Sequence, residues 1–170
     1  MTDERSAPAQ NAGERAMLEG WLDYHRRTLA WKCEGLSDAQ LRTAAVEPSA
    51  LSLLGLVRHM ADVERSWFRR VLVGDDAGPI YYSDDDRDGE FHLTEHDTWQ
   101  AAYDTWQGEI AIARRHAAGF GLDDLSRGRS RFTDEPFNLR WIYTHMIEEY
   151  ARHNGHADLL RERLDGATGE

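Results

Sequence analysis

The sequence contains a single cysteine, Cys33, and this scarcity excludes two kinds of site. One thiol cannot form a disulfide within the chain, and it cannot build a zinc site from several thiolates. A lone cysteine is typical of proteins that work in a reducing compartment, so we expect a cytoplasmic protein. Nothing in the sequence identifies a base beside Cys33, and we therefore expect an inert thiol rather than a nucleophile.

Long hydrophobic runs and an excess of positive charge are also missing. No window approaches the ~18 consecutive apolar residues of a membrane-spanning helix, and the segment MTDERSAPAQNAGERA lacks the apolar core of a signal peptide. The 31 acidic residues outnumber the 20 lysines and arginines, which gives a formal net charge of -11. A surface that follows nucleic-acid phosphates needs clustered basic residues. We therefore expect neither a membrane protein nor a nucleic-acid-binding protein.

The 170 residues suffice for one domain with a substantial core. We expect this domain over residues 13–166, with a flexible tail at 1–12 and a short one at 167–170. Apolar residues recur at helical spacing in four long segments, near 14–34, 52–73, 94–118 and 137–164. A serine cap at Ser37 predicts a short helix after the first, and Thr94 is the expected cap of the third long one.

These elements predict the fold class. Residues 75–90 contain glycine, proline and a run of aspartates, which is typical of a long acidic loop between the second and third long helices. No segment shows the alternation of a strand. The sequence therefore predicts an all-α protein, an antiparallel four-helix bundle.

The last helical segment carries an unusual polar arc. His145, Glu149, His153 and His156 are spaced by four, four and three residues, so at roughly 100° per residue they fall within about 80° on the core face. A buried carboxylate costs several kcal/mol unless a charge or a metal compensates it. Arg152 could pair with Glu149, but that would leave three imidazoles without a role. A divalent cation would satisfy the carboxylate and the imidazoles together, and Glu149 and His153 can reach one ion.

A third ligand must come from another helix. His59 flanks the apolar face of the second long helix, and His25 lies within the apolar face of the first. Periodicity alone leaves His25 at least as good a candidate, although a single histidine on an apolar face is usually a hydrogen-bonded core residue. For His145 and His156, a hydrogen-bonding or substrate-facing role competes with ligation.

Other metal motifs are weaker. His92 and His96 are four residues apart, but they straddle a helix start in the acidic loop. The sequence has no HExxH motif, which excludes a zincin. A di-iron bundle needs two Glu-x-x-His repeats, and neither is present.

The segments GLVRHMADVERSWF, LRWIYTHM and EEYARHNGHADLLRE resemble the DinB/YfiT-like superfamily, specifically its mini-circle-protein branch. The resemblance covers roughly residues 14–166. It implies a four-helix bundle with one divalent metal, zinc first and nickel or iron as alternatives, held by His59, Glu149 and His153. The resemblance, and not periodicity, favours His59 over His25. The related mycothiol-dependent maleylpyruvate isomerases share this His, Glu, His set.

The resemblance also implies a function. Relatives use the metal with a low-molecular-weight thiol, because a metal with an open coordination position lowers the pKa of a bound thiol. We therefore expect a metal-dependent transferase or isomerase whose partners are a thiol such as mycothiol and an electrophile, with His25, His145, His156 and Arg152 around the site; a homodimer is allowed. The alternative is a non-enzymatic metal-binding bundle with a structural or stress-related sensing role. A fourth ligand from His145 or His156 would close the site and favour that alternative.

Overall fold

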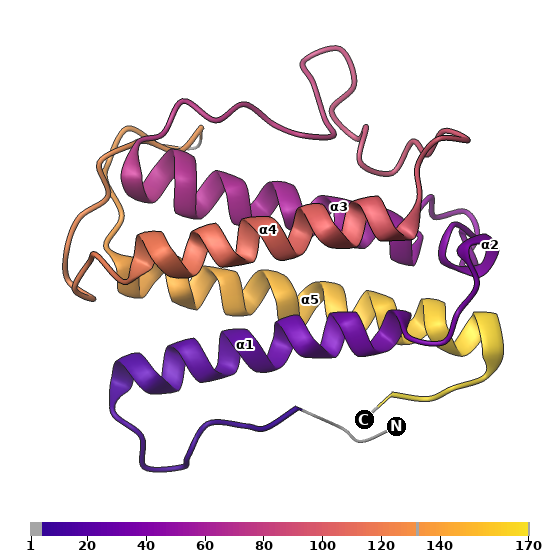
Figure 1. The fold of residues 1–170 in the computed structure, drawn as a ribbon, viewed down its shortest axis with the longest axis horizontal. Helices are drawn as coiled ribbons and strands as arrows, with labels where there is room; N and C mark the ends of the chain where they lie inside the picture. Colours follow the sequence, from indigo (N-terminus) through magenta and orange to yellow (C-terminus); the bar gives the residue numbers. More distant parts are fainter. Residues whose placement is uncertain (1–4, 132, 170) are drawn as a thin grey trace.

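The structure is a computed structural model that describes residues 5–131 and 133–169. Its helices, in chain order, are α1 (Glu14–Cys33), α2 (Asp38–Leu41), α3 (Leu53–Glu64), the π-helical η1 (Arg65–Val73), α4 (Trp99–Ala117) and α5 (Leu139–Asp165). Within the described residues there is no β-strand, only one isolated bridge between Leu125 and Asn138. The prediction of an all-helical bundle is confirmed (Figure 1).

The expected tails are described only in part. Residues 1–4 and residue 170 lie outside the described residues, and the segments 5–12 and 167–169 contain no helix. None of the helices in the described part of the chain is long and apolar enough to span a bilayer.

Most predicted helix ends agree with the structure. Ser37 and Gln40 form both halves of a capping box at α2, and Gly74 ends η1 with a φ of 75°, a left-handed conformation that glycine adopts at little cost. The expected cap at Thr94 is wrong. Thr98 accepts the capping hydrogen bond of α4, whereas the backbone N–H and hydroxyl of Thr94 both donate to Asp97 and close the preceding turn.

The second long helix changes its geometry halfway along. It runs over the expected residues, but after Glu64 the α-helix gives way without a break to the nine-residue π-helix η1. Runs of this geometry are rare and occur frequently at functional sites. The sequence pattern did not indicate it.

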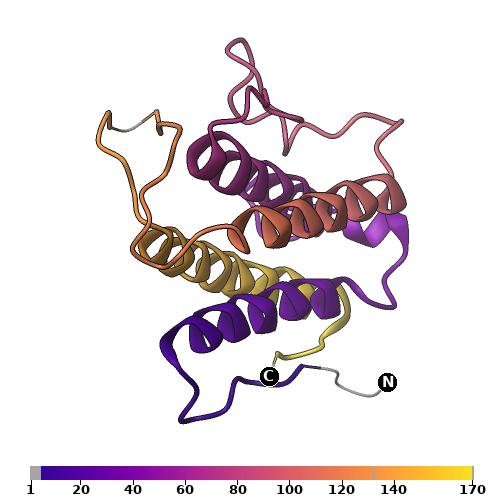
Figure 2. The same cartoon turned by 60° about the vertical axis from the view of Figure 1, so that its left-hand side comes forward.

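Contacts between the helices establish their directions. Arg65 donates to Glu109, and further along both elements His116 lies 3.1 Å from the Phe68 carbonyl, so α3–η1 and α4 run parallel. By the same reasoning α1 and α5 are parallel, because Tyr143 bonds to Glu19 and Arg161 to the carbonyl of Lys32. Figures 1 and 2 show α1 beside α5 and α3 beside α4.

The bundle therefore contains two pairs of parallel neighbours, α3–η1 with α4 and α1 with α5. A short connection after η1 would force α4 to run antiparallel to it. Residues 74–98 instead form a non-helical segment that returns the chain along the length of the bundle before α4 begins. The 19 residues of α4 measure about 28 Å at 1.5 Å per residue, and the returning segment is long enough to span this distance.

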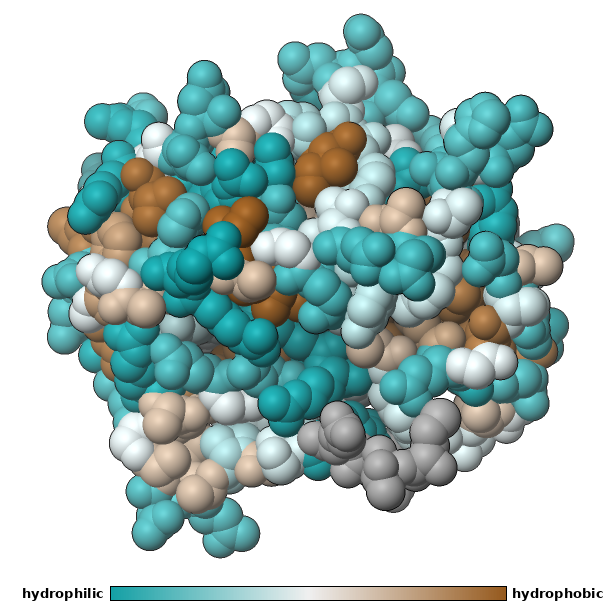
Figure 3. Space-filling view, in the orientation of Figure 1, coloured by the Kyte–Doolittle hydropathy of each residue, from teal (hydrophilic) through white to brown (hydrophobic). Residues whose placement is uncertain are grey.

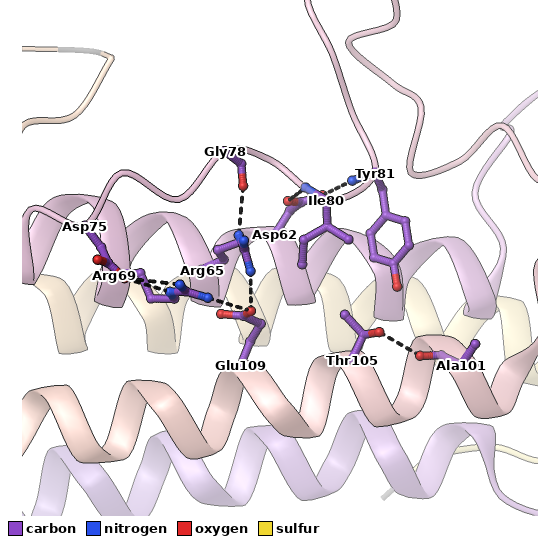
Figure 4. Close-up of polar contacts among 10 residues, drawn as sticks. All are labelled: Asp62, Arg65, Arg69, Asp75, Gly78, Ile80, Tyr81, Ala101, Thr105 and Glu109. Carbon is purple, nitrogen blue, oxygen red and sulfur yellow. Dashed lines mark hydrogen bonds and ion pairs between the residues drawn. The ribbon is translucent and has the colours of Figure 1, made fainter.

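Polar side chains of α3 and η1 fasten the start of this returning segment (Figure 4). The carboxylate of Asp62 accepts hydrogen bonds from the backbone N–H groups of Ile80 and Tyr81, at 2.7 and 3.0 Å. Arg65 donates to the carbonyl of Gly78 at 2.8 Å and also binds Glu109 on α4. These hydrogen bonds hold the start of the segment against α3, and its later residues continue from this attachment.

A polar network lies at the centre of the apolar core. The guanidinium of Arg26 on α1 binds both oxygens of Glu64, each at 2.7 Å, and Tyr150 on α5 donates to the same carboxylate at 2.7 Å. Trp106 on α4 then donates to the hydroxyl of Tyr150 at 2.8 Å. The network joins all the long helices, whereas the outer face in Figure 3 is largely hydrophilic with scattered apolar residues.

Candidate metal centre

The structure brings together the three residues favoured by the family resemblance. One donor atom from each of His59 on α3 and Glu149 and His153 on α5 lies within 4.8 Å of the other two. The rings of His59 and His153 are 4.7 Å apart, and Nε2 of His153 lies 3.5 Å from a carboxylate oxygen of Glu149. All three side chains are half-buried. We call these residues the ligand group.

His59 is held in place by a residue from the returning segment. Its Nδ1 lies 3.0 Å from the carboxylate of Glu90, which is buried, and its ring stacks on Phe91. Burial is the largest influence and raises the pKa of Glu90, but the hydrogen bond with His59, a backbone hydrogen bond and the charges of His59 and Arg58 together outweigh it, so the pKa is lowered. An ionised Glu90 accepts a hydrogen bond from the Nδ1–H group of His59, which leaves Nε2 of His59 unprotonated and able to bind a metal.

His153 has a similar support on its own helix. Its Nδ1 lies 3.3 Å from Nδ1 of His156, so one of the two nitrogens must carry the proton. Burial and the neighbouring His153 lower the pKa of His156, which favours a neutral His156 ring. Nε2 of His153 then faces Glu149, whose pKa is lowered chiefly by the hydrogen bond with His153.

His145 lies on the other side of Glu149. Its Nε2 is 3.5 Å from Glu149, and its ring packs against Trp67 and Trp141. With Glu148 and Glu149 it forms a second group of closely spaced donors. This placement suits either a hydrogen bond to Glu149 or a further ligand.

The other predicted residues lie apart from the ligand group. His25 faces Asn154, whose amide is 3.3 Å from its Nδ1. Burial lowers the pKa of His25. Arg152 pairs with Glu148 at 2.6 Å and not with Glu149. His92 is exposed and lies against an aspartate of the loop, and the exposed His96 is likewise outside the ligand group.

Glu90 is the site residue that the sequence did not reveal. It is one of many acidic residues in the returning segment, and no spacing links it to His59. A weak signal exists in the sequence, because Glu90 immediately precedes Phe91, an apolar residue in an otherwise polar stretch. Its buried carboxylate retains one oxygen, Oε2, without a hydrogen-bond partner among the described residues.

A cavity of about 200 Å³ opens beside the ligand group, and we call it the site cavity. His59 and Glu149 form part of its wall, and Glu90, His145 and Trp67 also line it. A small molecule in this cavity would therefore contact the donors of the ligand group directly.

Comparison with known proteins assigns the chain to a protein family. The family model described as mycothiol-S-transferase matches residues 17–166. The chain belongs to the mycothiol-S-transferase family. This match confirms the DinB/YfiT-like resemblance. No curated protein matches the chain. A crystal structure of a conserved protein from Enterococcus faecalis is similar, with a TM-score of 0.60 and 14% identity over 89% of this chain and 96% of that one. At that identity the likeness shows the fold alone.

In this member of the mycothiol-S-transferase family the donor set fits a divalent metal. Two imidazoles and one carboxylate suit zinc and similar first-row ions. The buried carboxylate of Glu90 on His59 is a support that metal-binding histidines usually have, and His153 has a half-buried partner in His156. Because the ligand group borders the site cavity, a metal held there would face a space large enough for a further ligand.

Proposed function

We propose that the chain is a metal-dependent thiol transferase. One divalent ion, zinc in the first instance, is held by His59, Glu149 and His153, and a small thiol such as mycothiol reacts with an electrophile beside it. The single observation that carries the proposal is the convergence of the ligand group at the wall of the site cavity. The membership in a family named for mycothiol transfer supports the choice of thiol.

The bound metal would supply Lewis acidity, which lowers the pKa of a coordinated thiol. The chain itself orients the donors. Glu90 accepts a hydrogen bond from Nδ1 of His59, and His156 fixes the ring of His153. The negative charge of Glu149 partly offsets the charge of the ion, so the ion would be a weaker Lewis acid here than in a site built from imidazoles alone.

A second function is supported by His145. Its Nε2 lies 3.5 Å from Glu149, close enough to become a fourth protein ligand after a small side-chain movement. Four protein ligands are typical of structural zinc sites, whereas catalytic sites keep a position open. A closed site would favour a non-enzymatic bundle with a structural or sensing role.

Cobalt substitution distinguishes the two functions. In the Co(II) protein, we expect mycothiol to produce a near-ultraviolet charge-transfer band, because thiolate sulfur binds the ion directly. Plain cysteine should give a weaker band. The His153→Ala protein should give none, whereas His92→Ala, which changes an exposed loop histidine, should behave as the unmodified chain does.

Metal-dependent conjugation of mycothiol to a generic electrophile should accompany the band. A protein that binds cobalt through four protein ligands, with no band on adding thiol, would contradict the transferase proposal and support the structural one.

A further inference from the structure

The lining of the site cavity is rich in arginine. Arg70 from η1, Arg87 from the segment 74–98 and Arg129 from the segment 118–138 all line the cavity, together with His59 and Glu149 of the ligand group. We call these three arginines the arginine wall. In a chain with a net charge of -11, cationic side chains from three separate segments meet at one small cavity.

Two of these arginines are not neutralised by carboxylates. Arg70 donates to the hydroxyl of Tyr82 at 3.3 Å, a neutral partner, and Arg87 has no hydrogen bond or ion pair among the described residues. By contrast, Arg65 and Arg69, on the same π-helix as Arg70, both bind Glu109. Two guanidinium groups at the site cavity are therefore available to an anion.

The third arginine has only a weak partner. Arg129 lies 3.2 Å from Asp134, and both side chains are mostly exposed. Exposed ion pairs of this kind contribute little free energy and exchange readily with another anion. Arg131 also lines the cavity.

The acidic residues of the site cavity are engaged elsewhere. Asp62 accepts hydrogen bonds from two backbone N–H groups of the returning segment, and Glu90 accepts one from Nδ1 of His59. Glu149 lies beside His153 in the ligand group. None of the three is paired with the arginine wall, so these carboxylates leave its guanidinium groups available to a ligand in the cavity.

We infer that the arginine wall binds a carboxylate group of the electrophile, so that the co-substrate is a small organic acid. The inference rests on the proposed function, since it assigns the second substrate of that same site. Guanidinium groups bind carboxylates and phosphates through paired hydrogen bonds. A carboxylate carries less charge than a phosphate and meets less repulsion from Asp62, Glu90 and Glu149. The cavity volume of about 200 Å³ suits a small molecule.

Binding to the metal-free protein tests this inference without any turnover. The full chain, stripped of metal with a chelator and dialysed, is titrated calorimetrically with succinate and with succinamide, the uncharged amide of the same carbon skeleton. We expect saturable binding of succinate only. Arg70→Met and Arg87→Met should each weaken it about tenfold, which is the scale of a lost charge-assisted hydrogen bond. Arg115→Met removes an exposed arginine of α4 outside the cavity and should change nothing.

If Arg70→Met fails to fold, Arg87→Met still tests the inference. Arg87 is exposed and has no hydrogen-bond or ion-pair partner in the described part of the chain. Equal binding of succinamide, unchanged affinity in Arg87→Met, or tighter binding of inorganic phosphate than of succinate would each overturn the assignment of a carboxylate.

Failure of this inference and failure of the proposed function are distinguishable. Succinate binding by a protein that never loads metal would contradict the transferase proposal and leave the carboxylate site standing. A thiol band in the cobalt protein, without succinate binding, would overturn the carboxylate site alone.

Discussion

Removing Glu90 should weaken metal binding although Glu90 is not expected to touch the metal. Its carboxylate is 6% exposed and lies 3.0 Å from Nδ1 of His59. Without it, the ring of His59 loses the acceptor that selects its tautomer and fixes its orientation. Loss of such a partner typically costs tenfold to a hundredfold in metal affinity, or about 1.4–2.7 kcal/mol. We expect the loss of metal affinity in Glu90→Ala to fall in this range. Glu90→Gln keeps an acceptor oxygen, so its loss should lie at the lower end.

The assay is competition for zinc against a chromophoric chelator at fixed pH. The matched control is Asp88→Asn, which removes one negative charge from an exposed residue of the same segment. Its zinc affinity should equal that of the unmodified chain, so a general charge effect is separated from the contact with His59. Unchanged zinc affinity in Glu90→Ala would refute the reasoning.

Three further predictions concern the rest of the molecule. Glu64→Leu leaves the charge of Arg26 without its main buried partner, so urea denaturation should show a free energy of unfolding lower by about 3–5 kcal/mol; a loss much smaller than this would contradict the prediction. Burial raises the pKa of Cys33 to about 12, and iodoacetamide should alkylate it at neutral pH only in denaturant. For Asp23, burial raises the pKa, but the hydrogen bonds and the positive charges of Arg114 and Arg26 together outweigh it, so the pKa is lowered. The side chain therefore stabilises the fold above its unfolded pKa of about 3.9, and this contribution is lost as the pH falls through the lower folded value. The free energy of unfolding of Asp23→Asn should therefore fall less steeply at acid pH than that of the unmodified chain, and an equally steep fall would contradict this.

Local patterns in the sequence predicted local structure well. Helical periodicity located the long helices, and the Ser37 capping box follows from side chains that bond within three residues of themselves. The spacing of Glu149 and His153 likewise placed two donors on one face, because residues four apart on an α-helix are neighbours. Such predictions need no knowledge of the tertiary fold.

Features that depend on distant parts of the chain were not predictable in this way. Periodicity could not choose between His59 and His25, since both lie on apolar faces and only the packing of α3 against α5 separates them. Glu90 supports His59 because the segment 74–98 returns along the bundle, and neither its path nor the parallel direction of α4 is encoded in local spacing. Thr94 and Thr98 offer the same hydroxyl one turn apart, and contacts of the turn decided which of them caps α4.

The metal content of purified variants tests the central claim most directly. The chain, purified without chelator and reconstituted with zinc, should carry about one equivalent of metal by elemental analysis, as expected for a single three-donor site. His59→Ala, Glu149→Ala and His153→Ala should each lose most of it after dialysis, whereas His92→Ala should retain it. Full metal content in His59→Ala, together with loss in His25→Ala, would contradict the account.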